Sequence, residues 1–185
     1  MEMRKTELEG VIEFQPKRHG DERGWFSEVW NQATLANLGI DIEWVQDNEA
    51  RSAAAGTLRG LHFQIDPHAQ DKLVRVVAGR VLDVAVDIRR SSPTFGQHVA
   101  VELSSDLGNQ LLVPRGFAHG YYTLEPDSVI AYKVSGFYSP ECDRSLKWDD
   151  PDLGIDWPVD EHDVVVSGKD QQAPSFQDIG SSLFD

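Results

Sequence analysis

Short runs in which apolar and polar residues alternate recur along most of this chain, and they predict β-strands. The clearest runs are 72–78, 80–88, 98–103 and 128–134, because successive side chains of a strand point to opposite faces. Clusters of Gly, Pro, Asp and Ser separate these runs at short and fairly regular intervals. The pattern predicts an all-β protein whose strands form an antiparallel sandwich or jelly roll.

Three segments near the N-terminus add to this picture. Residues 31–38 predict one short helix, with Asn31 as its N-cap and Gly39 just after its end. Alternating apolar residues predict a strand over 40–46. The polar and small residues that follow predict a loop over 46–56.

We expect a single domain over 1–185, with a C-terminal arm of about 136–185 in which turns dominate. The formal net charge of -14 disfavours nucleic acid and anionic membrane as partners. No apolar run approaches the length of a membrane span, and the N-terminus does not resemble a signal peptide. The one cysteine, Cys142, cannot form an internal disulfide, which favours a cytoplasmic location.

The segment 56–79, GTLRGLHFQIDPHAQDKLVRVVAG, carries the strongest chemical signals. It predicts two short strands joined by a polar loop. Strand alternation puts His62 and Gln64 on one face, with Arg59 on the reverse face unless the strand bulges. The second strand begins at Lys72. A histidine and a lysine at the mouth of a β-structure predict proton transfer near a developing negative charge.

Several other residues fit either ligand binding or ordinary structure. Gln46 and Asn48 suit the edge of a pyrimidine, and asparagine in such a segment is also a common turn former. Trp25 and Phe26 suit stacking on a planar base, and equally the packing of a hairpin. Tyr132 by itself suits a barrel tyrosine with a satisfied hydroxyl. The residues alone leave these alternatives open.

Two motifs resemble those of cupin barrels. The second cupin motif, Gly-x5-Pro-x-Gly-x2-His, is complete at 108–119 (GNQLLVPRGFAH). The first is altered, because it keeps His62 but has Gln64 and Lys72 where the family has two further metal ligands. A lysine ammonium has no lone pair to donate. With only His62 and His119 left, the resemblance implies a cupin barrel whose metal site has become a metal-free cationic pocket.

A longer series of motifs resembles one family within the cupins. GDERGWF, QDN, LRGLHFQ, KLVRVVAGRVLDVAVDIR, SPTFG, PRGFAHGY, YKV, FYSPE, WDDPDLGIDWP and GKD occur in this order. From about Glu7 to Phe176 the chain is similar to the dTDP-4-dehydrorhamnose 3,5-epimerase family. The resemblance implies a cupin-type antiparallel β jelly roll with a few short helices, without metal or other cofactor. It also implies an isomerase that inverts C3 and C5 of dTDP-4-dehydro-6-deoxy-D-glucose through enolates, giving dTDP-4-dehydro-L-rhamnose.

The resemblance further implies roles for individual residues. His62 is the general base, Asp170 is its paired carboxylate, and Tyr132 is the general acid on the opposite face of the sugar. Lys72 and Arg59 are the cationic groups near the sugar carbonyl and the diphosphate. The other substrate-binding positions implied are Arg23, Phe26, Glu28, Gln46, Asp47, Asn48, Asp83, His119, Tyr138, Asp143 and Lys169.

The family also implies a homodimer in which the segment Arg23 to Glu28 enters the neighbouring subunit's site.

Three positions depart from the common pattern and bear on substrate preference: Phe63 replaces Tyr, Asp143 replaces Glu, and Gly168 replaces an acidic residue. The alternatives are an epimerase acting at C3 only or C5 only, a ketoisomerase, and a non-catalytic cupin that binds a nucleotide sugar. Retention of base, acid and cation together argues against the last two.

Overall fold

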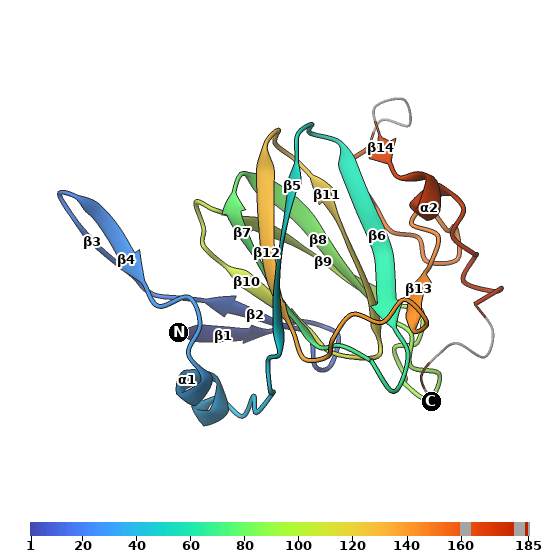
Figure 1. The fold of residues 1–185 in the computed structure, drawn as a ribbon, viewed down its shortest axis with the longest axis horizontal. Helices are drawn as coiled ribbons and strands as arrows, with labels where there is room; N and C mark the ends of the chain where they lie inside the picture. Colours follow the sequence, from blue (N-terminus) through green and yellow to red (C-terminus); the bar gives the residue numbers. More distant parts are fainter. Residues whose placement is uncertain (160–163, 180–183, 185) are drawn as a thin grey trace.

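Two β-sheets face one another in the computed structural model, which describes residues 1–159, 164–179 and 184 (Figure 1). The first sheet has six strands, and every neighbouring pair in it is antiparallel. In spatial order these strands are β1 (Glu2–Lys5), β2 (Ile12–Gln15), β10 (Gln110–Val113), β7 (Lys72–Ala78), β12 (Ser128–Val134) and β5 (Gln46–Ser52).

The second sheet lies opposite the first and is closed at one side by residues from the C-terminal part of the chain. One short strand, β14 (Val165–Val166), runs parallel to β6. The remaining strands are antiparallel and follow the order β13 (Asp143–Ser145), β6 (Thr57–Gln64), β11 (Phe117–Thr123), β8 (Arg80–Asp87) and β9 (His98–Ser104). This architecture confirms the predicted all-β jelly roll.

Two short helices and a separate hairpin complete the described chain. Helix α1 (Gln32–Asn37) has Asn31 as its N-cap, as predicted, and α2 (Gly168–Gln171) lies beside β6. The hairpin of β3 (Arg18–Asp21) and β4 (Gly24–Ser27) extends away from the two sheets (Figure 1). Neither described helix is long and apolar enough to cross a membrane.

Both faces of β8, within the second sheet, are buried, and its two aspartates, Asp83 and Asp87, are buried with its apolar residues. Val81 and Ala85 point into the core between the two sheets. Val84 and Val86 point the other way, into a cluster that includes Trp157 and other residues after β12. The C-terminal part of the chain therefore acts as a cover for the outer face of this sheet.

The main difference between the predicted and the observed secondary structure lies in residues 40–56. The loop expected over 46–56 is wrong, since β5 occupies Gln46–Ser52, and the strand expected over 40–46 is also wrong, since 40–45 is irregular. β5 is the edge strand of the first sheet, and its residues alternate between exposed and half-buried. Polar side chains suit both of its faces, so hydrophobic alternation could not reveal the strand.

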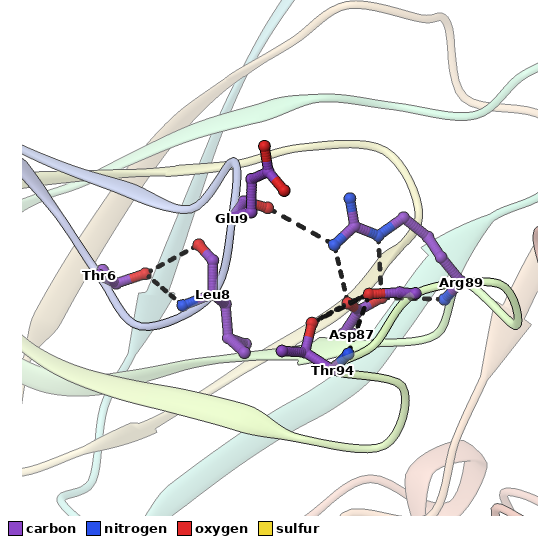
Figure 2. Close-up of polar contacts among 7 residues, drawn as sticks. Thr6, Leu8, Glu9, Asp87, Arg89 and Thr94 are labelled. Atoms are coloured by element: carbon purple, nitrogen blue, oxygen red, sulfur yellow. Dashed lines mark hydrogen bonds and ion pairs between the residues drawn. The ribbon is translucent and has the colours of Figure 1, made fainter.

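A buried ion pair anchors the turn that follows β8 (Figure 2). The carboxylate of Asp87 is fully buried and accepts hydrogen bonds from the Arg89 guanidinium at 2.7 and 2.9 Å. It also accepts the hydroxyls of Ser92 at 2.6 Å and Thr94 at 2.7 Å. Arg89 in turn donates to the Glu9 carbonyl at 3.5 Å, which connects this turn to the N-terminal segment.

We expect Asp87 to make the fold sensitive to acid. Burial by itself raises the pKa of Asp87, but hydrogen bonds from Arg89, Ser92 and Thr94 outweigh it and lower the pKa to about 2. The folded-state pKa lies below the unfolded value of about 3.9. The ionised carboxylate therefore stabilises the fold above pH 4, and this contribution is lost as the pH falls towards 2.

Urea unfolding of Asp87→Asn tests this expectation. The substitution should cost about 3–5 kcal/mol near neutral pH, because it leaves the Arg89 charge without its partner. The difference from the unmodified chain should shrink between pH 4 and 2. The control is Asp127→Asn, which breaks the exposed pair with Arg51 and should cost less than about 1 kcal/mol. Equal costs for the two variants would contradict the assignment.

Candidate active site

A cavity of about 360 Å³ is lined by residues from both sheets at the side where β5 and β6 lie. Its walls carry imidazole, ammonium, phenol, amide and carboxylate groups. The lining residues are Gln46, Asn48, His62, Phe63, Gln64, Gln70, Lys72, Tyr132, Tyr138 and Asp143. Seven of the predicted site residues therefore lie around one cavity.

A β-bulge in β6 brings Arg59 and His62 to the same face. His62 pairs with His119 of β11 and Arg59 pairs with Tyr121, so three steps along β6 oppose two steps along β11. Gly60, between them, has φ +129°, and a Cβ there would lie 2.6 Å from the Cα of Gly120. Only glycine fits this close approach, which resolves the question of which face Arg59 occupies.

The His62 imidazole forms a short polar contact, with its Nε2 2.6 Å from Oδ1 of Asp170. Asp170 is buried in α2, whose N-cap Ser167 accepts the Asp170 backbone N–H at 3.1 Å. The other oxygen of Asp170 accepts the Gly60 N–H at 3.4 Å. These contacts fix the carboxylate, and the carboxylate fixes the imidazole ring.

The electrostatics of Asp170 favour its ionised form. Burial raises the pKa of this carboxyl group, but hydrogen bonds from His62, Ser167 and Gly60, with attraction to the His62 imidazole, lower it overall. An ionised Asp170 accepts the Nε2–H of His62 and leaves Nδ1 as the ring nitrogen able to take a proton. It also stabilises the imidazolium that forms when this proton arrives.

Lys72 opens β7 and is almost completely buried. Its ammonium donates to the His62 carbonyl at 3.1 Å, which places the charge beside the imidazole-bearing strand. Burial lowers the pKa of Lys72 to about 8, against the opposing influence of Asp83 and Asp143. A cation with few water neighbours interacts strongly with a negative charge that forms nearby.

Tyr132 approaches the cavity from the first sheet, opposite His62. It pairs with Val74, which lies two residues from Lys72 and so on the same face of β7. Burial raises the pKa of the Tyr132 phenol, and Arg59 opposes this shift. The phenol is therefore protonated at neutral pH and can donate.

Two further residues of the cupin motifs, His119 of the complete motif and Gln64 of the altered one, have partners within the protein. His119 Nε2 lies 2.9 and 3.0 Å from the two carboxylate oxygens of Asp83, and both side chains are buried. Gln64 donates to the carbonyls of His68 and Phe137, at 2.7 and 3.1 Å, and accepts the N–H of Ser139 at 2.7 Å. The described residues contain no group of three or more His, Cys, Asp or Glu arranged to hold a metal ion.

Polar residues at the rim of the cavity form a connected set. Gln46 donates to the Asn48 side chain at 2.7 Å and accepts the backbone N–H of Tyr138 at 3.3 Å. The Tyr138 hydroxyl donates to Asp143 at 3.4 Å, and Asp143 also forms an ion pair with Lys169. The rim thus presents amide groups at one side and a phenol, a carboxylate and an ammonium at the other.

Eight predicted binding residues do not line this cavity within one chain: Arg23, Phe26, Glu28, Asp47, Arg59, Asp83, His119 and Lys169. Asp47 points away from it, forms an ion pair with Lys133 at 2.8 Å and lines a second cavity. Arg23 and Phe26 lie on the β3–β4 hairpin, which extends away from the two sheets, and Glu28 follows the hairpin and accepts from Asn31 at 3.0 Å (Figure 1). The Phe26 side chain is left 72% exposed.

The structure adds residues that were not predicted for the site. Gln64 and Gln70 fasten residues 136–139 to the cavity wall, since Gln70 donates to the Gly136 carbonyl at 2.7 Å. Ser167 orients Asp170 through the N-cap contact. Ser167 precedes the acidic first turn of α2, which is an N-cap signal readable in the sequence. The altered cupin motif and strand alternation draw attention to Gln64, whereas nothing local in the sequence points to Gln70.

Comparisons with known proteins agree with this geometry. A family model described as dTDP-4-dehydrorhamnose 3,5-epimerase matches residues 5–178. The protein of that name from Sinorhizobium fredii is 52% identical over 91% of this chain and 86% of its own length. The one from Shigella flexneri is 47% identical over 96% of this chain and 97% of its own length.

A solved structure agrees as well. The Legionella pneumophila dTDP-6-deoxy-D-glucose-3,5-epimerase, in complex with dTDP-4-keto-L-rhamnose, is 44% identical, with a TM-score of 0.94. The match covers 99% of this chain and 97% of that chain.

The buried ammonium of Lys72 yields a direct spectroscopic prediction. In protein carrying ¹³C-labelled lysine, one Cε signal should titrate near pH 8, because burial lowers the pKa of Lys72. A free lysine titrates at about 10.4. Lys72→Met should remove the early-titrating signal and leave the others in place. If every lysine signal titrated near its ordinary value, the cavity would be more hydrated than the structure indicates.

Proposed function

This chain belongs to the dTDP-4-dehydrorhamnose 3,5-epimerase family and is an isomerase, and we propose that its cavity inverts C3 and C5 of dTDP-4-dehydro-6-deoxy-D-glucose. The observation that carries the assignment of roles is the placement of His62 and Tyr132. They extend into one cavity from opposite sheets, so a sugar ring between them would meet a base on one face and an acid on the other.

The first step is removal of a proton from the carbon next to the keto group. His62 takes this proton at Nδ1, while Asp170 holds the ring orientation and stabilises the imidazolium. The electron pair of the broken C–H bond forms a C=C bond to the carbonyl carbon. The π electrons of the carbonyl group move onto its oxygen, which gives the enolate. Lys72, buried and charged, stabilises the enolate oxygen electrostatically.

The second step is protonation of the same carbon from the opposite face. Tyr132 gives its phenolic proton to the enolate carbon, which inverts the centre and leaves a phenolate. His62 has then gained one proton and Tyr132 has lost one, so exchange with solvent restores both. The same pair of residues can act at C3 and at C5 if the ring presents each carbon in turn.

The other predicted residues supply binding. Arg59 is on the cavity side of β6 through the bulge, where its guanidinium suits a diphosphate oxygen. Gln46 and Asn48 offer amide donors and acceptors to a pyrimidine edge. Further binding roles are proposed for Asp47, Asp83, His119, Tyr138, Asp143 and Lys169.

A homodimer is part of this proposal. The β3–β4 hairpin exposes Trp25 and Phe26, and it extends where a second copy of the chain could receive it (Figure 1). In the partner's cavity, Arg23, Phe26 and Glu28 would contribute to nucleotide binding. We also propose a cytoplasmic location, on the basis of the single free thiol of Cys142.

His62 and Tyr132 should fail in different ways when each is replaced. His62→Ala should reduce both deuterium exchange from D₂O and epimerisation by at least about 10²–10⁴-fold, because no enolate forms without the base. Tyr132→Phe should still exchange deuterium but yield little inverted product, because the enolate is reprotonated from the face it left. Proton NMR of the substrate in D₂O measures both quantities, and equal losses in Tyr132→Phe would contradict the two-face assignment.

Mixing two inactive variants tests the shared hairpin. His62→Ala lacks the base, and Arg23→Ala/Phe26→Ala lacks the segment given to the partner. If the hairpin acts across the dimer, a heterodimer has one intact site, and an equal mixture should recover roughly a quarter of full activity after subunit exchange. If each hairpin serves its own chain, the mixture should show only the average of the two parents.

A further inference from the structure

The β3–β4 hairpin extends from the two sheets with little of its surface buried (Figure 1). Among the residues of its two strands only Arg18 and Ser27, at the root, are half-buried, and the others are exposed. A cavity of about 320 Å³, lined by residues of the hairpin and of β7, lies at this root. An isolated two-stranded hairpin is only marginally stable in water. The order and direction of the hairpin therefore depend on contacts at its root.

Arg18, the first residue of β3, attaches the hairpin to the rest of the chain. Its guanidinium donates from Nη1 to the Asp106 carbonyl and from Nη2 to the Ser105 carbonyl, both in the turn between β9 and β10. The guanidinium carbon also lies 4.1 Å from the centre of the Trp25 ring. The pairing of the two strands makes Arg18 and Trp25 diagonal neighbours on one face of the hairpin. One side chain thus joins both strands of the hairpin to the second sheet.

The turn between β9 and β10 has the shape that this guanidinium needs. The N–H groups of Gly108 and Leu107 donate to the carbonyl and the hydroxyl of Ser104, at 2.8 and 3.0 Å, which fixes the turn. The Leu107 carbonyl accepts Nε2 of Gln15, at the end of β2, at 2.8 Å. Gly108 has φ +68°, and a Cβ there would lie 2.5 Å from Nη2 of Arg18. The glycine that opens the complete cupin motif therefore leaves the space that the guanidinium fills.

We propose that Arg18 is a positioning residue that holds the β3–β4 hairpin in the direction in which it reaches the cavity of a second copy of the chain. The inference rests on the proposed homodimer, in which Arg23, Phe26 and Glu28 enter the partner's cavity. Arginine suits this task because its planar fork donates to two carbonyls while it stacks on an aromatic ring, which a lysine ammonium does not do. A hairpin that is already held in its bound direction loses less conformational freedom on association.

Two substitutions remove this attachment from opposite sides. Arg18→Lys keeps the charge and loses the fork, and Gly108→Ala displaces the guanidinium with a methyl group. The matched control is Gly154→Ala. Gly154 also has a positive φ, +57° against +68°, but a Cβ there would meet nothing within 4 Å. The control therefore introduces similar backbone strain without a collision.

Amide hydrogen exchange over residues 18–27, followed by mass spectrometry, reports the order of the hairpin without relying on activity. In Arg18→Lys and in Gly108→Ala this segment should exchange at least about tenfold faster, the factor that corresponds to loss of one hydrogen bond from a charged group. Exchange over β1 and β2 should stay the same. Gly154→Ala should exchange over residues 18–27 as the unmodified protein does. Unchanged exchange of the hairpin in Arg18→Lys would overturn the proposal.

Steady-state kinetics with dTDP-4-dehydro-6-deoxy-D-glucose provide the second readout. If the hairpin keeps its direction for only about a tenth of the time, KM should rise about tenfold, and kcat should change little because the catalytic groups are untouched. Gly154→Ala should leave both constants unchanged. Faster exchange with an unchanged KM would overturn the link between Arg18 and the partner's cavity. Absence of rescue on mixing the two inactive variants described above would instead refute the shared hairpin itself, so the two failures are distinguishable.

Discussion

The close approach of β6 and β11 at Gly60 and Gly120 is the constraint on which the site depends. A side chain at either position would collide with the backbone of the other strand, so the bulge can form only with glycine at both. The bulge inserts one extra residue into β6 between Arg59 and His62. Both side chains therefore lie on the face of the strand that meets the cavity. It also leaves the Gly60 N–H free to donate to Asp170. One backbone irregularity thus places a cation and a base together and helps to hold the carboxylate that supports the base.

The C-terminal cover over the second sheet is the second feature that positions the site. The outer face is covered by residues after β12, and this same part of the chain carries Asp170 back to β6. The cover is therefore both a packing element and the support for the His62 imidazole. Because hydrophobic contacts set the position of the cover, weakening them should loosen the 2.6 Å contact between His62 and Asp170 without touching either residue.

Much of the fold followed from alternation in the sequence, and the failures have physical causes. The strands with one or two apolar faces were predicted, since burial imposes a pattern on them. β5 was missed because Gln46 and Asn48 line the cavity while the reverse face meets solvent, so neither face had to be apolar. For the site, the segment containing His62 and Lys72 was visible from residue chemistry. Asp170, far away in the sequence, could be joined to His62 only through family resemblance, because strand alternation carries no information on contacts between distant segments.

The charge distribution explains how an acidic protein can serve an anionic substrate. The net charge is -14, but His62 and Lys72 line the cavity, each held by a specific neighbour, and Arg59 lies on the same face of β6 as His62. Asp83 and Asp143 raise the pKa of Lys72 while burial lowers it, so the ammonium survives at neutral pH in a place where it is poorly hydrated. A charge with few water neighbours gains more from a nearby enolate than an exposed one does. The carboxylates around Lys72 therefore keep it charged, and the burial that works against that charge is also what makes it effective in the reaction.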